Sequence, residues 1–115
     1  MDKKEKLYNY SFKGIYEMYV QKIERKERTK VELNQIIAWL TGYKEDEIEN
    51  IEKTLSLKDF FEDAPFMNPN ANLIKGVICG CRVEEIEDDI TQKIRWMDKI
   101  VDELAKGKKI EKIMR

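Results

Sequence analysis

The sequence predicts an all-α fold, a compact single-domain bundle of five or six helices. Apolar residues recur every three or four positions along several stretches, which is the spacing of one helix face. The 115 residues include only two prolines and five glycines, so strong helix breakers are few. Charged residues make up 39% of the chain, above the ~25% typical of soluble domains, as expected for helices with charged outer faces.

We assign residues 7–115 to the single helical domain and residues 1–6 to a charged, frayed lead. The first helix is expected from Tyr8 or Ser11 to Lys26. Its apolar stripe consists of Phe12, Ile15, Tyr16, Tyr19 and Ile23.

The second helix has the clearest boundaries, about Lys30 to Thr41. Thr29 and Glu32 have the spacing of a capping box, in which each side chain bonds the backbone of the other residue. Gly42 is placed to end the helix in a left-handed conformation. The stripe between them consists of Leu33, Ile36, Ile37 and Leu40.

Two shorter helices and a turn are expected in the middle of the chain. The first is acidic and runs from about Lys44 to Lys53. The second begins after Ser56 and ends before Pro65, since the residue preceding a proline avoids helical geometry. Residues 68–72 have the composition of a turn.

Residues 74–83 fit two structures. A helix would place Gly76 and Gly80 on one face, and a short buried strand over residues 77–83 is the alternative. We favour the helix, because no other segment alternates clearly enough to pair with a lone strand.

The last long helix is the strongest prediction and is expected at the centre of the bundle. It begins with Asp88 or Asp89 as the cap and ends at Gly107. Its seam of apolar residues is heptad-like and consists of Ile90, Ile94, Met97, Val101 and Leu104. Ile110 and Ile113 indicate a final short turn.

The charge of the chain is unevenly distributed. Residues 1–30 and 90–115 each carry a net charge of +4, whereas residues 31–63 carry −6 and residues 64–89 carry −3. This pattern favours complementary packing between helices or head-to-tail association over a nucleic-acid surface, because the total charge is only −1. No apolar run is long enough for a membrane span and no signal peptide is visible, so a cytoplasmic protein without a membrane partner is expected.

The sequence contains no histidine, which excludes a Ser/His/Asp or Cys/His catalytic arrangement within the chain. We predict no cofactor and no metal. Cys79 and Cys81 are interpreted as reduced, buried small side chains, with soft-metal binding or redox chemistry as the alternative.

Two further groups of side chains are candidates for function. Arg82, Glu84 and Glu87 are expected on a salt-bridged surface; on a helix, Glu84, Glu87 and Asp88 would share a face that could hold a hard cation. Trp39 and Tyr43 flank the end of the second helix, where aromatic side chains pack at the core edge or contact a ligand or partner.

Three blocks of sequence carry a family resemblance. They are Lys22-x-Glu24-x-Lys26-x-Arg28-Thr29 with Trp39-Leu40-Thr41-Gly42-Tyr43; Phe60-Phe61-x-x-Ala64-Pro65 with Asn68-Pro69-Asn70; and Leu73-Ile74-x-Gly76-Val77-Ile78-Cys79-Gly80-x-Arg82-Val83-Glu84-x-Ile86-Glu87-Asp88, continuing into residues 98–108. The chain thereby resembles, from about Leu7 to Arg115, the small bacterial family catalogued as domain of unknown function 2200. That resemblance implies no reaction, ligand or partner.

The chain departs from that family's pattern at three positions. Glu17 and Asp89 stand where proline is common, and Glu27 stands where glycine is common. Because proline suits the first position of a helix, these departures indicate helix starts near Glu17 and Asp89.

We therefore expect a small binding or interaction module that associates with a protein partner or with itself. The alternative is a small enzyme or ligand-binding protein that uses Cys79, Arg82 and Glu84. A DNA-binding accessory protein is the third interpretation: residues 29–43 are similar to the opening helices of histone-like bacterial proteins, but nothing in the chain could form their β-arms.

Overall fold

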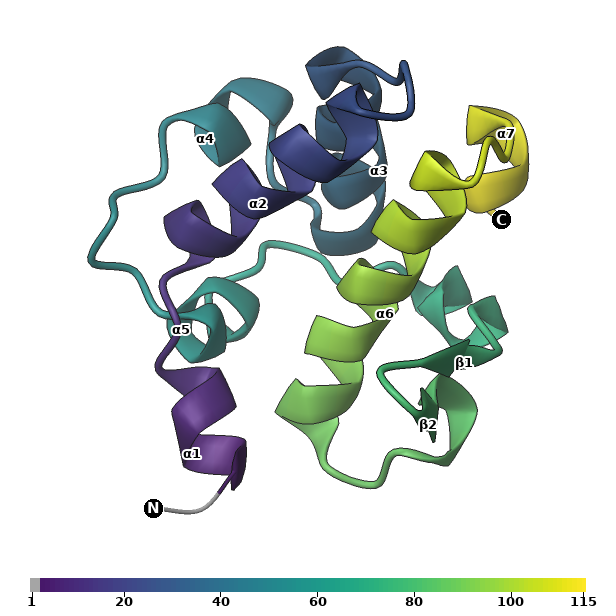
Figure 1. The fold of residues 1–115 in the computed structure, drawn as a ribbon. Coiled ribbons are helices and arrows are strands. Elements are labelled where there is room, and N and C mark those ends of the chain that lie inside the picture. Colours follow the sequence, from purple (N-terminus) through teal and green to yellow (C-terminus); the bar gives the residue numbers. More distant parts are fainter. Residues whose placement is uncertain (1–2) are drawn as a thin grey trace.

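The structure is a computed structural model that describes residues 3–115 (Figure 1). Within that range the chain forms seven α-helices, two short 3-10 helices and one small hairpin, which confirms the predicted compact and mainly helical domain. The elements are α1 (Lys3–Tyr8), α2 (Phe12–Glu24), α3 (Lys30–Thr41), α4 (Glu45–Glu49), α5 (Leu57–Glu62), η1 (Pro69–Leu73), β1 (Val77–Ile78), β2 (Cys81–Arg82), η2 (Val83–Glu85), α6 (Asp89–Ala105) and α7 (Ile110–Ile113).

The N-terminal region differs from the prediction in two respects. Residues 1 and 2 of the expected frayed lead lie outside the described residues, and residues 3–6 form most of α1. The chain then bends, and Ser11 caps a new helix, since its hydroxyl accepts a hydrogen bond from the Gly14 N–H at 3.3 Å. This helix, α2, continues through Glu17 without a break. The helix start indicated near Glu17 is therefore wrong.

The predicted boundaries of α3 and α6 are confirmed. Thr29 Oγ1 accepts from the Glu32 N–H at 3.2 Å, and a Glu32 carboxylate oxygen accepts from the Thr29 N–H at 3.0 Å. Gly42 ends α3 with φ of 80°. At the start of α6, Asp88 accepts from the Thr91 N–H at 3.0 Å, so Asp89 is the first helical residue. Each of these helix starts depends on a hydrogen bond between residues three apart in the chain, so the residue types that make the bond can be recognised in the sequence.

The favoured helix over residues 74–83 is wrong. Strand structure does form there, as in the alternative, but as two mostly exposed strands of two residues each and not as one buried strand over residues 77–83. β1 and β2 pair as an antiparallel hairpin, with Val77 opposite Arg82 and Ile78 opposite Cys81. The chain reverses at Cys79 and Gly80, whose φ values of 52° and 79° are incompatible with a right-handed helix. The strand finds its partner in the residues that follow it immediately.

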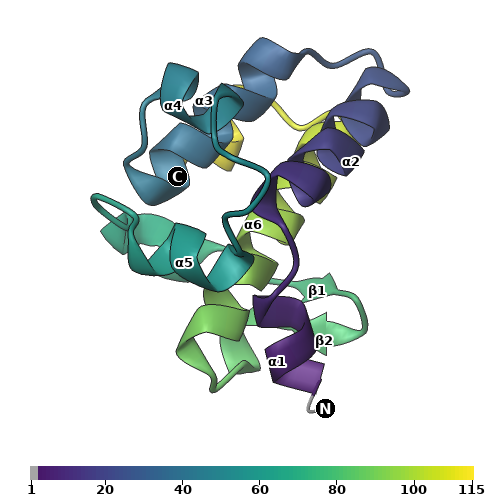
Figure 2. The ribbon, with the colours of Figure 1, turned by 90° about the vertical axis from the view of Figure 1, so that its left-hand side faces the viewer.

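The core is built around α6, as predicted. This helix packs against α1, α2, α3, α5, α7 and β1, and Figure 2 shows it running through the middle of the fold. Its buried face includes Ile94, Met97 and Leu104. Beside it, the rings of Phe12 and Phe60 stack with centroids 3.9 Å apart.

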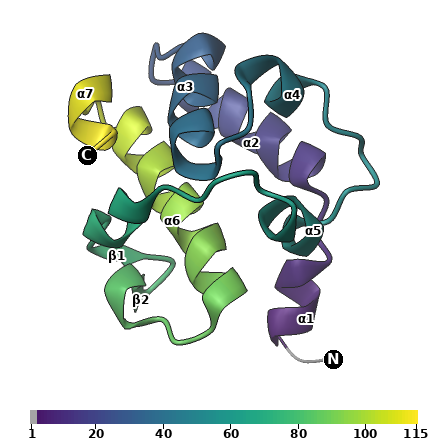
Figure 3. The same ribbon diagram turned by 180° about the vertical axis from the view of Figure 1, so that it is seen from behind.

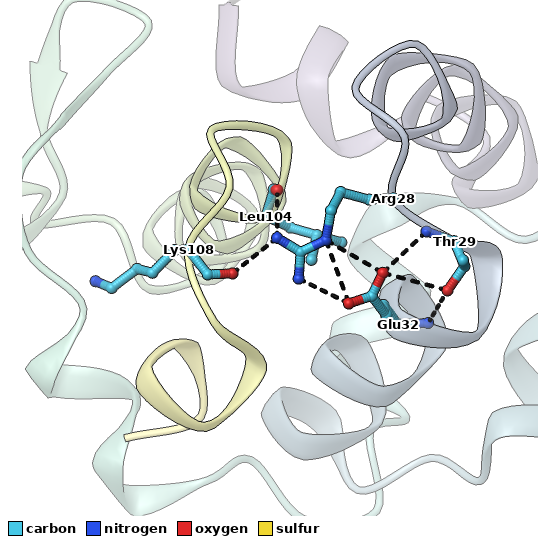
Figure 4. A network of polar contacts seen from close by, with 5 residues as sticks. All are labelled: Arg28, Thr29, Glu32, Leu104 and Lys108. Atoms are coloured by element: carbon cyan, nitrogen blue, oxygen red, sulfur yellow. Dashed lines mark hydrogen bonds and ion pairs between the residues drawn. The ribbon is translucent and has the colours of Figure 1, made fainter.

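Arg28 connects three elements at the far end of α6 (Figure 4). Its guanidinium donates to both carboxylate oxygens of Glu32, at distances from 2.7 to 3.2 Å. Its Nη1 donates to the carbonyl oxygens of Leu104 at 3.3 Å and Lys108 at 2.9 Å. The end of α6, which lacks intrahelical partners for its last carbonyls, is thus closed by a residue from the α2–α3 turn.

Candidate functional site

A groove of about 540 Å³ lies between α1, α2, α6 and the tip of the hairpin. We call it the α2–α6 groove. Its apolar lining is contributed by Leu7, Tyr10, Ile15, Met18, Leu57, Ile78 and Ile94, and its polar lining by Tyr19, Gln21, Lys22, Arg25, Cys79, Arg95 and Asp98. A volume of this size is in the range of small-ligand sites.

Several apolar side chains in the groove are open to solvent. Met18 is 64% exposed and Tyr10 is 44% exposed. Met18 lies off the stripe of α2 that packs into the core, so its exposure follows from the helical period. Exposed apolar side chains gathered around one concave surface are typical of interaction sites.

The charged side chains of the groove do not all have partners. Asp98 is fully engaged, because one oxygen accepts from the Tyr19 hydroxyl and the other accepts from Arg95 Nη1 at 2.8 Å. Lys22 lies 3.4 Å from Asp102. Arg25, in contrast, is exposed and pairs with no carboxylate among residues 3–115. The groove therefore presents a positive charge beside its apolar surface.

Tyr19 connects the groove to the core. It is buried, and burial together with the charge of Asp98 raises its pKa well above 10. The hydroxyl therefore stays protonated and keeps donating to Asp98. Asp98 in turn helps to hold the Arg95 guanidinium, whose pKa is raised by that hydrogen bond against the opposing effect of burial.

Cys79 forms part of the groove wall at the tip of the hairpin. Its sulfur accepts a hydrogen bond from Arg95 Nη1 at 3.4 Å. Both Cys79 and Cys81 are exposed, so their interpretation as buried side chains is wrong. The turn at residues 79–80 pushes them out of the core, whereas a helix would have turned at least one of them inward.

Cys79, Arg82 and Glu84 do not converge on one site. Arg82 is exposed and lines a separate shallow depression with Cys81 and Glu85. Glu84 folds back, and its carboxylate accepts from the Gly76 N–H at 3.0 Å. This bond lowers the pKa of the Glu84 carboxyl and gives the residue a structural role at the base of the hairpin.

The expected acidic helix face does not form. Glu84 belongs to the 3-10 helix η2, Glu87 is exposed in the link before α6, and Asp88 caps α6 while accepting from the Tyr8 hydroxyl. Within residues 3–115, no three cysteine or carboxylate side chains are arranged so that they could hold a metal ion.

Trp39 and Tyr43 lie at the edge of the core. Tyr43 stacks on Phe60 with centroids 4.7 Å apart, and its hydroxyl donates to the Phe60 carbonyl at 2.6 Å. Burial, followed by the charges of Asp63 and Glu47, raises the pKa of Tyr43 to about 12. Trp39 is partly buried against the same core. Neither side chain reaches the α2–α6 groove.

Among the residues of this groove, only Cys79 was predicted from the sequence as a candidate for function, whereas Ile15, Tyr19 and Ile94 were predicted as apolar faces of helices. Met18, Arg25 and Arg95 were not predicted, because they come from the middle of α2, the end of α2 and α6, and no sequence motif links these three positions. The one available signal was Met18, a large apolar residue off the buried stripe of its helix.

No helix among residues 3–115 has the length and apolar character that crossing a membrane requires.

Comparisons with known proteins give a family but no activity. The family model DUF2200, described as an uncharacterized protein conserved in bacteria, matches residues 6–115. A crystal structure of "uncharacterized protein SP1917" is 39% identical in sequence and has a TM-score of 0.90, with 99% of this chain and 93% of that chain covered. No curated protein matches the chain.

Proposed function

Because this chain belongs to the DUF2200 family of uncharacterised bacterial proteins, we propose its function from the structure alone: it is a binding module that captures an apolar group bearing a negative charge. The observation that carries this proposal is the α2–α6 groove, where exposed Met18 and Tyr10 lie beside the unpaired Arg25. Exposed thiols at Cys79 and Cys81 support a reducing compartment such as the cytoplasm.

The apolar part of the ligand would supply most of the binding free energy. Covering an exposed apolar surface is worth about 25 cal/mol per Å², and Met18 and Tyr10 are the groove side chains with the most surface left to cover. Methionine also adapts its shape to different partners. The groove is therefore suited to a range of apolar groups.

The charged part of the ligand would be selected by Arg25. A carboxylate placed against it gains a charge-assisted hydrogen bond without displacing a protein carboxylate. Asp98 does not repel such a ligand strongly, because Arg95 and Tyr19 occupy its two oxygens.

The contents of the groove support binding rather than catalysis. Histidine is absent from the sequence, and Asp98, the one carboxylate that lines the groove within residues 3–115, is held by two donors. A free general base of either common kind, imidazole or carboxylate, is therefore missing from the described lining of the groove.

We would test the proposal with two apolar anions, anilinonaphthalene sulfonate as a fluorescent probe and decanoate as its competitor. The probe should brighten with the native protein and be displaced by decanoate. Met18→Gln should weaken the binding of both the probe and decanoate. Val31→Gln should weaken neither, because Val31 lies on α3 outside the groove, although its side chain is about as exposed (65%) as that of Met18 (64%).

The charge requirement has its own matched pair of variants. Arg25→Gln should weaken decanoate binding by about fivefold, which corresponds to about 1 kcal/mol for one exposed charge pair. Lys26→Gln removes the same charge one residue away, outside the groove, and should have no effect. Equal effects of the two variants, or no binding by the native protein, would contradict the proposal.

A further inference from the structure

We propose that the α2–α6 groove receives a second copy of this chain, through residues 62–66 of that copy with Phe66 as the anchor. We call residues 62–66 the Phe66 segment. This inference rests on the proposed function, since it names the partner of the same groove. It commits to head-to-tail self-association, and the argument has three parts: an exposed aromatic side chain, matching charges and opposite faces.

Phe66 is an exposed aromatic ring on a fixed backbone. Its side chain is 67% exposed. Its N–H donates to the Thr41 carbonyl at 3.1 Å, and the next turn is held by the N–H of Asn68, which donates to the Leu40 carbonyl at 2.9 Å. Gly42 allows the segment to lie this close, because a Cβ there would come within 2.7 Å of the Phe66 nitrogen.

This arrangement lowers the cost of binding. Phe66 bonds the last carbonyl of α3, and Asn68, just after the segment, bonds the carbonyl before it, so the backbone around Phe66 is already fixed before a partner arrives. An aromatic side chain presented on an ordered backbone loses little conformational freedom when it is covered. Aromatic residues, phenylalanine among them, are enriched at protein–protein interfaces.

The charges of the two surfaces are complementary. Glu62 and Asp63 are exposed and stand four and three residues before Phe66 in the chain. Glu62 lies 3.8 Å from Lys58 in an exposed ion pair, so Asp63 is the negative charge of the segment that no lysine or arginine among residues 3–115 pairs with. The groove offers Lys22 and the unpaired Arg25 beside its apolar surface. The same match appears in the whole chain, since residues 31–63 carry a net charge of −6 and residues 1–30 carry +4.

The two surfaces lie on opposite sides of the molecule. In Figure 2, α2 and the hairpin are at the right, whereas α3 and the chain that follows α5 are at the left. Figure 3 shows that following segment crossing the face away from α2. The Phe66 segment therefore cannot fill the groove of its own molecule.

Opposite placement determines the kind of assembly. Two different surfaces that meet head to tail leave one of each unused at the ends. The assembly therefore grows with concentration, as an open chain or until it closes into a ring, and does not stop at a symmetric dimer. The contact centres on one ring and a few charges, so it belongs among weak, transient interfaces.

Sedimentation equilibrium over about 10 µM to about 1 mM, the range for a weak contact, tests the inference. The average mass of the native protein should rise above that of one chain and continue past two. Phe66→Ala should remain near the mass of one chain, whereas Val31→Ala, which shortens an equally exposed apolar side chain elsewhere, should associate like the native protein.

A charge exchange makes the test specific. Arg25→Glu alone and Glu62→Lys with Asp63→Lys alone should each remain monomeric, because each places like charges on both surfaces. A mixture of the two variants should regain association, since every contact between unlike partners is again attractive. Phe66 and Arg25 are exposed, so these variants should keep the native circular dichroism spectrum and melting temperature.

The outcomes separate the two proposals. A native protein that stays monomeric at about 1 mM, or a mixture that fails to regain association, overturns the second-copy proposal. If that native protein still binds decanoate through Arg25, the groove stands as a binding site for another partner. If decanoate does not bind either, both proposals fall. Association that Phe66→Ala leaves unchanged also overturns the inference.

Discussion

Gly42 and Phe66 are in backbone contact, and only a residue without a Cβ permits it. Gly42 has φ of 80°, and a Cβ built on it would lie 2.7 Å from the nitrogen and 2.9 Å from the carbonyl oxygen of Phe66. The end of α3 and the chain after α5 can therefore pack this closely only because residue 42 has no Cβ atom. Two different demands, a left-handed conformation and a close approach, fall on one residue.

A pair of glycine substitutions separates those two demands. Gly107 has φ of 94° but nothing within 4 Å of its ideal Cβ, so Gly107→Ala should cost about 1 kcal/mol for the left-handed conformation alone. Gly42→Ala should cost at least about 1 kcal/mol more, since it also forces overlapping atoms apart. Urea unfolding measures both. Equal losses would mean that the contact with Phe66 is relaxed in solution.

Glu27→Gly is expected to stabilise the protein. Glu27 has φ of 63° in the turn between α2 and α3, a conformation that costs an ordinary residue about 1 kcal/mol or more and glycine almost nothing. The gain should be about 0.5–1 kcal/mol after the greater entropy loss of glycine. The same change at Glu17, exposed within α2, should instead cost about 1 kcal/mol. Urea midpoints of the two variants should move in opposite directions.

Glu32 gives the fold a specific sensitivity to acid. The hydrogen bond from Arg28 is the main reason that the pKa of the Glu32 carboxyl is lowered. A carboxyl with a lowered folded pKa contributes stability that is present above its unfolded pKa and is lost as the pH falls through the folded pKa. Glu32→Gln should therefore lose stability at pH 7, and its difference from the native protein should shrink as the pH falls through the folded pKa of Glu32. Thermal melts across that range measure the difference, and a constant gap would contradict it.

Arg28→Ala tests the closure of α6. The change leaves the carbonyls of Leu104 and Lys108 without this donor and the Glu32 carboxylate without its partner, for a cost of about 2 kcal/mol. Arg28→Lys should recover only part of it, because an ammonium cannot bond both oxygens of a carboxylate while reaching two carbonyls. Full recovery by lysine would show that charge alone matters here. Chemical denaturation distinguishes the three proteins.

Buried tyrosines set the alkaline limit of stability. Burial is the first cause that raises the pKa of Tyr16 and of Tyr43 to about 12, and burial is also the first cause that raises the pKa of Tyr19 well above 10. A raised folded pKa contributes stability that is complete below the unfolded value of about 10 and is lost as the pH rises through the folded pKa. Unfolding should therefore begin between pH 10 and about 12. Absorbance of tyrosinate and circular dichroism should change together, and Tyr43→Phe should remove one of the late-titrating groups.

The elements that the sequence predicted well are those fixed by near neighbours. Thr29, Glu32 and Gly42 mark both ends of α3 within a few residues, and Asp88 does the same for the start of α6. The helix α4 ends at Glu49 rather than near Lys53, because few apolar contacts hold an exposed acidic segment in place.

The hairpin and the groove were not predictable in the same way. Ile74, Val77 and Ile78 have a helical spacing, and the sequence does not display that the chain turns left-handed at Cys79. The pair Cys79-Gly80 also lacks the asparagine or aspartate that usually marks a two-residue hairpin turn. The groove depends on this turn, since Ile78 and Cys79 form its fourth wall beside residues of α1, α2 and α6 that are distant in the chain.

The hairpin that forms this side of the groove is held by more hydrogen bonds at its base than at its tip. The base of the hairpin is tied by the Val83 N–H to the Gly76 carbonyl at 3.0 Å and by Gln92 to the Val83 carbonyl at 3.0 Å. The tip contacts the helix through the Cys79 sulfur and Arg95. The same Arg95 Nη1 also donates to Asp98 at 2.8 Å. The tip therefore depends on a donor that it shares with a carboxylate of α6, whereas the base has two donors of its own.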